Sequence, residues 1–448
     1  MKINDTIVAA ATPYGYGGIA VVRISGNKAE KIAQKICQTH GSFKNRHATK
    51  VTLYDQNRHP FDSAVVLFYK SPNSYTGEDV VEISCHGNPT IVEKIVGETV
   101  DRGGRLAEPG EFTQRAFING KLDLVQAESV AAVIQGDSER SNQLSHRVLA
   151  GELSNILREI KKSIIKALSY VEFELDISED DLLPNSVQQI KQEVASALLR
   201  MKRLTESFNE GRLLNRGATV VIAGPPNIGK STLFNMLLNE NRSIVSTTPG
   251  TTRDVVDASV VYDGMRVFLT DTAGIRDTGE EIEYEGIRRA SEKIKSADLV
   301  LNMFDINTRS ILKTTNFNNP TIPVLNKCDL YSKRQIKTVN NSIEDCVCVS
   351  AKTGSGIAVL KNVIKKSLQI SNNNSDSVYL ITQRQYDIAK DCARALKRTL
   401  LMLKNKKSDF ELLSIELRDA LEAIDKILGK TTSSDILNNI FSNFCVGK

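Results

Sequence analysis

The stretch "GPPNIGKS" at residues 224–231 constrains the fold of this 448-residue chain more than any other feature. It matches GxxxxGK[ST] and lies between a β-branched run, "ATVVIAG", and a helical run, "STLFNMLLN". A glycine-rich loop between a strand and a helix turns backbone amides toward bound phosphate groups. Lys230 then reaches the β and γ phosphates, and the Ser231 hydroxyl supplies a magnesium ligand. The sequence therefore predicts a phosphate-binding loop in an α/β domain.

Three further motifs follow in order, each after a predicted strand. In "DTAG" at residues 271–274, a carboxylate can hold the magnesium water shell and the last amide can sense the γ phosphate. In "NKCD" at residues 326–329, Asp329 can accept both N–H donors of guanine, which adenine lacks. "SAK" at residues 350–352 adds a backbone contact to the guanine oxygen. Four such motifs at the carboxyl ends of strands predict GTP rather than ATP.

The residues predicted to bind GTP lie in these four motifs, directly after the first of them at Thr232, and in "SIVSTTPGTTRD". Thr252 of that stretch is the second predicted hydroxyl ligand for magnesium besides Ser231. They are Asn227, Ile228, Gly229, Lys230, Ser231, Thr232, Ser246, Thr247, Thr248, Pro249, Gly250, Thr251, Thr252, Asp271, Thr272, Ala273, Gly274, Asn326, Lys327, Asp329, Ser350, Ala351 and Lys352.

The residue directly after "DTAG" is Ile275. Ras-like switches hold a glutamine there, which orients the attacking water, whereas an isoleucine side chain neither donates nor accepts a hydrogen bond. Either another group places the water or the chain hydrolyses GTP very slowly. The motif itself leaves both readings open.

The chain is too long for one hydrophobic core, and its pattern of predicted strands and helices changes along its length. Residues 1–120 mix strand patterns such as "GGIAVVRISG", "DSAVVLFY" and "DVVEIS" with a helix pattern, which predicts a small α+β domain. Residues 216–372 alternate strands and helices, as in a parallel α/β sheet. Residues 121–215 and 373–448 are predicted to form one helical domain into which the α/β module is inserted.

Amphipathic periodicity of three or four residues predicts helices at 149–168, 186–208, 383–403, 410–428 and 435–444. The composition, 41% hydrophobic and 25% charged, is that of an ordinary soluble protein. The net charge of +5 permits an anionic partner such as RNA without requiring one.

Seven cysteines are scattered along the chain, and the spacing of Cys346 and Cys348 suits neither a CxxC zinc site nor a redox motif. Free thiols in a reducing compartment are the simplest interpretation. No apolar run approaches the roughly 20 residues that span a bilayer. We therefore expect a cytoplasmic protein with no membrane partner.

Several stretches resemble the tRNA uridine-5-carboxymethylaminomethyl modification GTPases, the MnmE/TrmE family. They are "GPPNIGKSTLFN", "VSTTPGTTRD", "DTAGIRDTGEEIEYEGI", "TIVAAATPYGYGGIAVVRISG", "EPGEFTQRAFINGKLDLVQAES" and the terminal "FCVGK". The resemblance covers essentially the whole chain in the same order. It implies an N-terminal folate-binding and dimerisation domain, a helical domain and an inserted Ras-like P-loop GTPase domain.

The resemblance also implies the activity and the partners. A homodimer works with an FAD-containing partner in a heterotetramer or larger complex and modifies carbon 5 of the wobble uridine of tRNA. The one-carbon unit comes from 5-formyltetrahydrofolate or a related folate.

Hydrolysis in this family depends on potassium and on dimerisation of the GTPase domain. Besides Lys230, the resemblance gives Asn227 and Glu283 catalytic roles, the first with potassium and the second in orienting the water. Asn227 read alone is a residue suited to a tight turn, and Glu283 lies in a charged run whose carboxylates are usually solvated. The potassium ligands that the resemblance implies are Asn227, Ser246, Thr248 and Thr251.

The resemblance assigns the folate site to Arg23, Glu82, Lys121 and Lys448. The first three would otherwise read as ordinary surface charges. The tail "CVGK" carries Cys445, a further catalytic candidate. This thiol acts as a nucleophile if a nearby cation lowers its pKa, or it simply packs. A frayed terminus is the plain alternative for the whole tail.

Two other classes of GTPase compete with this interpretation. A ribosome-assembly or other RNA-associated switch shares "TTPGTTRD", but the segment after residue 377 lacks a GxxG loop in a βα context. A structural GTPase that assembles on membranes would require a basic amphipathic face, and none is clear in the sequence.

Overall fold

The computed structural model describes residues 5–136, 138–176, 186–239, 257–271, 292–306, 319–368, 379–404, 409–442 and 444–448. The chain divides into two compact units. The first contains Met1–Ile134, Val148–Met201 and Asp387–Lys448, and the second contains Gln135–Arg147 and Lys202–Tyr386.

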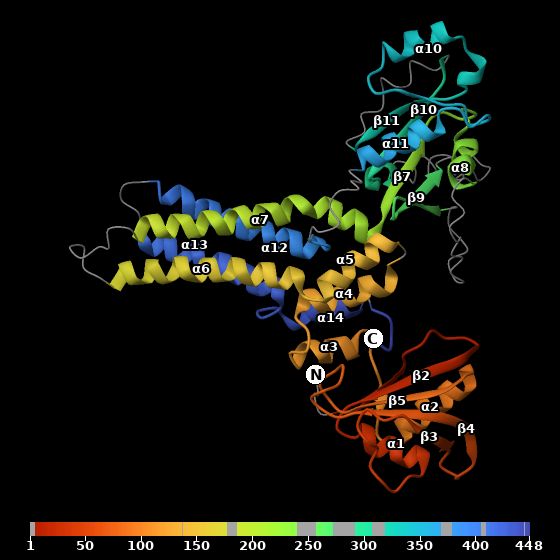
Figure 1. Cartoon of the computed structure of the whole chain (residues 1–448), viewed down its shortest axis with the longest axis vertical. Helices are drawn as coiled ribbons and strands as arrows, with labels where there is room; N and C mark the ends of the chain where they lie inside the picture. The colour runs from red at the N-terminus through yellow and green to blue at the C-terminus, as the bar shows by residue number, and fades with distance from the viewer. Residues whose placement is uncertain are drawn as a thin grey trace, which may run out of the picture. The chain divides into compact units, whose positions relative to one another are not determined.

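The first unit begins with a six-stranded sheet in the order β3-β4-β5-β2-β1-β6 (Figure 1). Its strands are β1 (Ile7–Ala10), β2 (Gly17–Ser25), β3 (Thr49–Tyr54), β4 (Pro60–Tyr69), β5 (Val80–Gly87) and β6 (Arg105–Leu106). Neighbouring strands run antiparallel, except that β6 is parallel to β1. The three strands predicted from "GGIAVVRISG", "DSAVVLFY" and "DVVEIS" are β2, β4 and β5.

Two helices, α1 (Ala29–Cys37) and α2 (Pro89–Asp101), pack against this sheet. Helix α2 begins at Pro89 because the side chain of the preceding residue, Asn88, accepts a hydrogen bond from the Thr90 amide. Proline also suits the first position of a helix. Val22 and Ile24 of β2 are buried in the core that the helices cover. Successive side chains of a strand alternate between faces, so Arg23 lies on the opposite face.

Further helices confirm a helical region. They are α3 (Glu111–Ile118), α4 (Leu124–Gln135), α5 (Glu139–Leu149), α6 (Glu152–Asp176), α7 (Ser186–Arg216), α12 (Gln383–Met402), α13 (Phe410–Leu428) and α14 (Ser434–Ser442). Most lie in the first unit, α7 and α12 extend into the second, and α5 lies mainly in the second. Helix α13 has the predicted bounds, whereas α7 continues eight residues beyond the predicted end at Phe208. Lys161 of α6 pairs with Asp425 of α13 at 2.5 Å, so segments far apart in sequence share one helical layer.

The second unit contains another six-stranded sheet, in the order β12-β11-β10-β7-β9-β8 (Figure 1). Its strands are β7 (Ala218–Ala223), β8 (Asp257–Tyr262), β9 (Met265–Asp271), β10 (Leu299–Phe304), β11 (Thr321–Leu325) and β12 (Val347–Cys348). The helix α8 (Lys230–Asn239), the 3₁₀ helix η4 (Cys328–Leu330) and the helix α10 (Lys333–Asn340) lie between strands in the chain, and α11 (Ile357–Ser367) follows β12.

The expectation of a parallel sheet is wrong for one strand, because β8 runs antiparallel to β9. The two strands are joined by a two-residue turn at Asp263 and Gly264, whose φ angles are +47° and +77°. Such a turn produces a hairpin, and a hairpin is antiparallel. The other strand pairs of this sheet are parallel. In the described part of the chain, we find no helix with the length and apolarity needed to cross a bilayer.

Candidate functional site

The phosphate loop lies between the end of β7 and the start of α8, as predicted. Gly224 adopts φ +147°, and a Cβ there would lie 2.5 Å from the Met303 carbonyl oxygen of β10. Gly229 adopts φ +98°, and its Cβ would lie 2.5 Å from Nδ2 of Asn326. Both positions therefore require glycine, because the neighbouring atoms already occupy the space of a side chain.

Lys230 is 7% exposed, and its ammonium group folds back over the loop. Nζ donates hydrogen bonds to the carbonyl oxygens of Gly224 and Pro225, both at 2.9 Å. This geometry holds the positive charge beside the loop that receives the phosphates, so the charge needs little rearrangement when nucleotide binds.

Ser231 and Asp271 meet at the carboxyl ends of β7 and β9. The Ser231 hydroxyl donates to Oδ2 of Asp271 at 2.6 Å, and the Asp271 residue is 8% exposed. A hydroxyl and a carboxylate that converge next to a phosphate loop are the hard oxygen ligands that magnesium prefers. These two residues therefore fit a magnesium ion shared with a nucleotide.

Asn326 joins three loops of the site. Its Nδ2 donates to the Ile228 carbonyl oxygen of the phosphate loop at 2.8 Å, and its Oδ1 accepts from the Ala351 amide of "SAK" at 3.0 Å. The side chain is buried, with 2% of the residue exposed. Asn326 thus fixes the guanine motifs relative to the phosphate loop, a role that the sequence motif by itself did not reveal.

Lys327 extends this connection from the same motif. It has φ +62°, and its Nζ donates to the Asn227 carbonyl oxygen at 3.1 Å and lies 3.8 Å from Asp305. Asp329, two residues on, is exposed to solvent, as a carboxylate that receives a base must be. Asn227 has φ +61°, a left-handed turn conformation that asparagine tolerates, so its geometry agrees with the turn interpretation.

The structure thus brings together the described members of the predicted nucleotide site. Other predicted members lie outside the described residues: Ser246, Thr247, Thr248, Pro249, Gly250, Thr251, Thr252, Thr272, Ala273, Gly274 and Glu283. Ile275 lies outside them as well. Their roles stay predictions.

A second polar cluster lies on the open face of the first sheet. Arg23 and Glu82 are cross-strand partners, and Nε of Arg23 donates to Oε1 of Glu82 at 2.8 Å. The guanidinium carbon lies 5.5 Å from the ring centre of Tyr75 and 5.6 Å from that of Phe112. Tyr69 donates to the other Glu82 oxygen at 3.5 Å. Sequence reasoning missed all three aromatic residues, because their convergence depends on strand register.

The C-terminal tail docks beside this cluster. The Gly110 amide donates to the Cys445 carbonyl oxygen at 3.4 Å, and the Phe112 amide donates to that of Lys448 at 3.2 Å. Arg23 approaches the Gly447 carbonyl oxygen at 3.5 Å. The tail is therefore placed by contacts of its backbone, and the frayed-terminus alternative does not describe it.

Lys121 lies at the edge of this cluster. Its Nζ donates to the Pro72 carbonyl oxygen at 3.1 Å, on the loop that also carries Tyr75. The structure therefore places Arg23, Glu82 and the Lys448 backbone around one cluster, with Lys121 on an adjoining loop.

A buried ionic network holds the start of α3, where the tail docks. Glu111 is fully buried and accepts hydrogen bonds from Arg105 at 2.5 and 2.8 Å and from Arg115 at 2.8 Å. Arg115 also pairs with Asp5 at 2.6 Å and with Glu78 at 3.1 Å. Burial alone would raise the pKa of Glu111, but the hydrogen bonds from Arg105, from a backbone amide and from Arg115 hold that pKa below its ordinary value.

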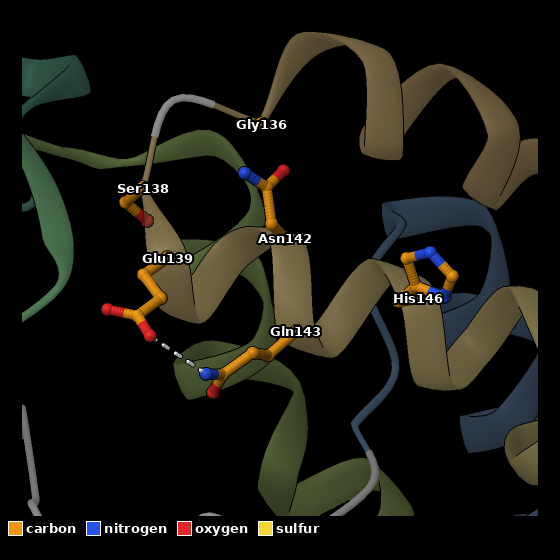
Figure 2. Close-up of a pocket in the computed structure, with 6 residues that line it drawn as sticks. All are labelled: Gly136, Ser138, Glu139, Asn142, Gln143 and His146. Atoms are coloured by element: carbon orange, nitrogen blue, oxygen red, sulfur yellow. Dashed lines mark hydrogen bonds between the residues drawn. The ribbon is translucent and has the colours of Figure 1, made fainter.

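A hollow of about 730 Å³ lies along α5, and none of the residues that line it is a predicted site residue (Figure 2). Polar side chains from one face of α5 and the turn before it line the hollow. The side chains are those of Ser138, Glu139, Asn142, Gln143 and His146, and Gly136 also lines the hollow. Gln143 donates to Glu139 at 3.3 Å, one turn away, so these groups partly satisfy one another. One polar helix face of this kind does not define a ligand.

The phosphate loop, the Ser231–Asp271 pair and the guanine motifs joined by Asn326 define a P-loop GTPase. Comparison with known proteins then gives the family. Residues 6–121 match the family model described as the N-terminus of the GTP-binding protein TrmE, and residues 124–445 match the MnmE helical domain. The chain therefore belongs to the MnmE (TrmE) family of tRNA modification GTPases.

Full-length relatives agree with this assignment. The chain is 40% identical over 460 residues to the tRNA modification GTPase MnmE of Thermotoga maritima, covering 99% of this chain and 100% of that protein. It is 37% identical over 451 residues to the Aquifex aeolicus protein of the same name, covering 100% of both.

Among solved structures, an Era complex with MgGDPNP and a fragment of 16S ribosomal RNA is similar at 25% identity. The match has a TM-score of 0.28 and covers 43% of this chain and 69% of that one.

Proposed function

We propose that this chain is a potassium-dependent, dimerisation-activated GTPase that takes part in modifying carbon 5 of the tRNA wobble uridine. As a homodimer, it would act with an FAD-containing partner in a heterotetramer or larger complex, in the cytoplasm where tRNA is processed. The product is an aminomethyl or carboxymethylaminomethyl group whose one-carbon unit comes from a folate. The observation that carries the GTPase part is Asn326, which joins the guanine motifs to the phosphate loop.

The residues of the nucleotide site have separable roles in hydrolysis. Lys230 balances phosphate charge, and Ser231 and Asp271 hold the magnesium ion, which when bound neutralises charge that develops on the phosphates. Asn326 keeps the base-binding and phosphate-binding loops at a fixed separation, so GTP meets a preformed site. Hydrolysis then needs a positive charge near the position of an arginine finger, which contributes about 10³–10⁵ in rate in other GTPases.

We assign that charge to a potassium ion held by Asn227 with Ser246, Thr248 and Thr251. Asn227 is exposed at the phosphate loop, and an amide oxygen is a suitable hard ligand for such an ion. GTP turnover should therefore be much faster in potassium than in sodium. Asn227→Ala should remove this stimulation but leave GTP binding largely intact, because Lys230 and the loop amides remain. Equal rates in the two salts would contradict the assignment.

We assign the orientation of the attacking water to Glu283. Glu283→Ala should slow hydrolysis without weakening nucleotide binding, whereas the matched control Ile275→Ala should change little. Single-turnover hydrolysis and GTP affinity, measured on both variants, separate the two effects. A large loss of hydrolysis rate in Ile275→Ala would show that the catalytic role is assigned to the wrong residue.

We assign the folate to the cluster around Arg23 and Glu82, with Lys121 and Lys448 contributing from the adjoining loop and the tail. The cluster fits such a ligand, because Glu82 can accept hydrogen bonds from a pterin and the rings of Tyr75 and Phe112 offer flat apolar surface. When bound, the folate supplies the one-carbon unit, and the protein binds and orients it. Titration of the purified chain with 5-formyltetrahydrofolate, beside Glu82→Gln, tests this placement directly.

The catalytic role of Cys445 is tested through the tail. Deleting "CVGK" should abolish tRNA modification in cells while GTP hydrolysis by the purified protein persists. Cys445→Ser, assayed for both activities, decides whether the exposed thiol takes part. Normal modification by that variant would exclude the thiol and leave Lys448 as the contributor from the tail.

The alternative function is a ribosome-assembly or other RNA-associated switch. Nucleoside analysis of tRNA from cells that lack this protein distinguishes the two. Loss of the wobble-uridine modification supports the proposal, whereas intact tRNA together with defective ribosomal subunits supports the alternative.

A further inference from the structure

Three cysteines gather at the guanine motifs of the second unit. Cys328 belongs to "NKCD", Cys348 ends β12 just before "SAK", and Cys346 lies two residues earlier. None of the three is in a disulfide, all are partly exposed, and they pack against one apolar cluster that includes Phe304 and Leu325. Residues far apart in the chain, 328 and 346–348, therefore place their thiols in one region.

Backbone contacts hold Cys328 and Cys348 beside each other. Cys348 is the cross-strand partner of Leu325, and the Cys328 amide donates to the Val349 carbonyl oxygen at 3.1 Å. The Cys328 thiol donates to the Leu325 carbonyl oxygen at 3.3 Å, and the Cys348 side chain neighbours the thiols of both Cys328 and Cys346. The thiols of Cys328 and Cys348 thus meet across the loops that are expected to hold guanine.

Clustered thiols commonly bind a soft metal ion or form a disulfide. Within the described ranges, no group of three or more His, Cys, Asp or Glu side chains is arranged to hold a metal ion. Burial raises the pKa of both the Cys328 thiol and the Cys346 thiol to about 12, so both are neutral near pH 7. Within these ranges the thiols therefore favour disulfide chemistry over metal binding. Cys348 neighbours both other thiols, but Cys346 lies on the same segment as Cys348, so a bond from Cys348 to Cys328 is the one that joins two separate loops.

We propose that Cys328 and Cys348 form a redox site, at which a peroxide converts the two thiols to a disulfide that joins "NKCD" to "SAK" and weakens GTP binding. One sulfur, as its thiolate, attacks a peroxide oxygen; the O–O bond breaks, and a sulfenic acid and water form. The second sulfur attacks the sulfenic sulfur, so that the S–S bond forms, the S–O bond breaks and a second water leaves. The two thiols lose two electrons and two protons, and hydrogen peroxide gains them as two waters.

The effect on GTP follows from the position of the bond. Disulfide sulfurs lie about 2.05 Å apart, much closer than two hydrogen-bonded thiols, so oxidation pulls Cys328 toward β12. Asp329 directly follows Cys328, and Asn326 lies two residues before Cys328. A shift there disturbs both the base-binding carboxylate and the hydrogen bonds that link the loops. Neutral thiols react slowly, so the site responds to sustained oxidation and not to traces of peroxide.

The test uses the full-length protein, oxidised with excess hydrogen peroxide and then reduced with dithiothreitol. Affinity for a fluorescent guanine nucleotide should fall at least tenfold on oxidation and return on reduction. Tryptic digestion without reductant should join residues 328–333 to residues 338–352, because cleavage falls after the flanking lysines. Cys348→Ser should bind nucleotide as the reduced wild type does and should not respond to peroxide.

The matched control is Cys346→Ser, which alters the same cluster but should keep the full response. Loss of the response in that variant would overturn the Cys328–Cys348 pairing, and unchanged affinity in oxidised wild type would overturn the proposal. The inference rests on guanine binding at "NKCD", which Asp329→Asn tests separately through base preference. If that variant changes base preference while oxidised wild type keeps its affinity, only the redox inference fails.

Discussion

Replacing Gly447 by alanine should release the C-terminal tail from the first unit. Gly447 is buried and adopts φ +96°, and a Cβ there would collide with the backbone carbonyl of Ala10 in β1. Because Ala10 belongs to the sheet, its carbonyl cannot move aside without disturbing the pairing of β1 with β2. The tail, rather than the sheet, should therefore give way.

The energies on the two sides support release of the tail. A non-glycine residue in the left-handed region costs about 1–2 kcal/mol before any collision is counted. Against this stand three long hydrogen bonds of the tail, at 3.4, 3.2 and 3.5 Å, each contributing about 0.5–1.5 kcal/mol. The strain and the collision together are thus comparable to the free energy that holds the tail in place.

Hydrogen exchange gives the direct assay, because the Gly110 and Phe112 amides bond to the tail. In Gly447→Ala these two amides should exchange faster, wobble-uridine modification in cells should fall, and GTP hydrolysis should be unchanged. The control is Val446→Ala in the same tail, since that side chain is 56% exposed. Unchanged exchange at both amides in Gly447→Ala would refute the docking argument.

Three other changes test the nucleotide site and the ionic network. Asn326→Ala removes two buried hydrogen bonds and should lower GTP affinity at least tenfold by calorimetry. Asp329→Asn should weaken GTP binding and favour xanthosine triphosphate in competition, because an amide can donate to the extra xanthine carbonyl. Glu111→Gln should cost about 3–5 kcal/mol of unfolding free energy at pH 7. The lowered pKa of Glu111 means that its contribution is lost as the pH falls through that pKa, so urea melts of variant and wild type should converge in acid.

The nucleotide site could be read from the sequence because each motif is local. Residues 224–231 contain the glycines, the lysine and the serine of the phosphate loop in one continuous segment. The roles of Lys230 and Ser231 could therefore be predicted without tertiary information. Asn326 was assigned to GTP binding but not to the bridge between loops. That role depends on how the phosphate loop and "SAK" meet in the sheet.

The N-terminal region was harder to predict, because its key contacts are not periodic. Helix α3 buries Glu111 and Arg115 where an amphipathic pattern would have apolar residues, so it gave no helix signal. Arg23 meets Tyr75 and Phe112 only through strand register and the packing of α3. No spacing in the sequence encodes those distances.

The two sites lie in different compact units, which makes their activities separable in principle. The described nucleotide-site residues all fall within Lys202–Tyr386, whereas the tail and the Arg23–Glu82 cluster belong to the first unit. A tail variant should therefore spare basal GTP turnover, and an Asn326 variant should spare tail docking as seen by exchange at Phe112. If modification is nevertheless lost in the Asn326 variant, intact docking is insufficient and modification requires GTP binding. The tail variant and the Asn326 variant together thus show whether the two sites are functionally coupled or act independently on one chain.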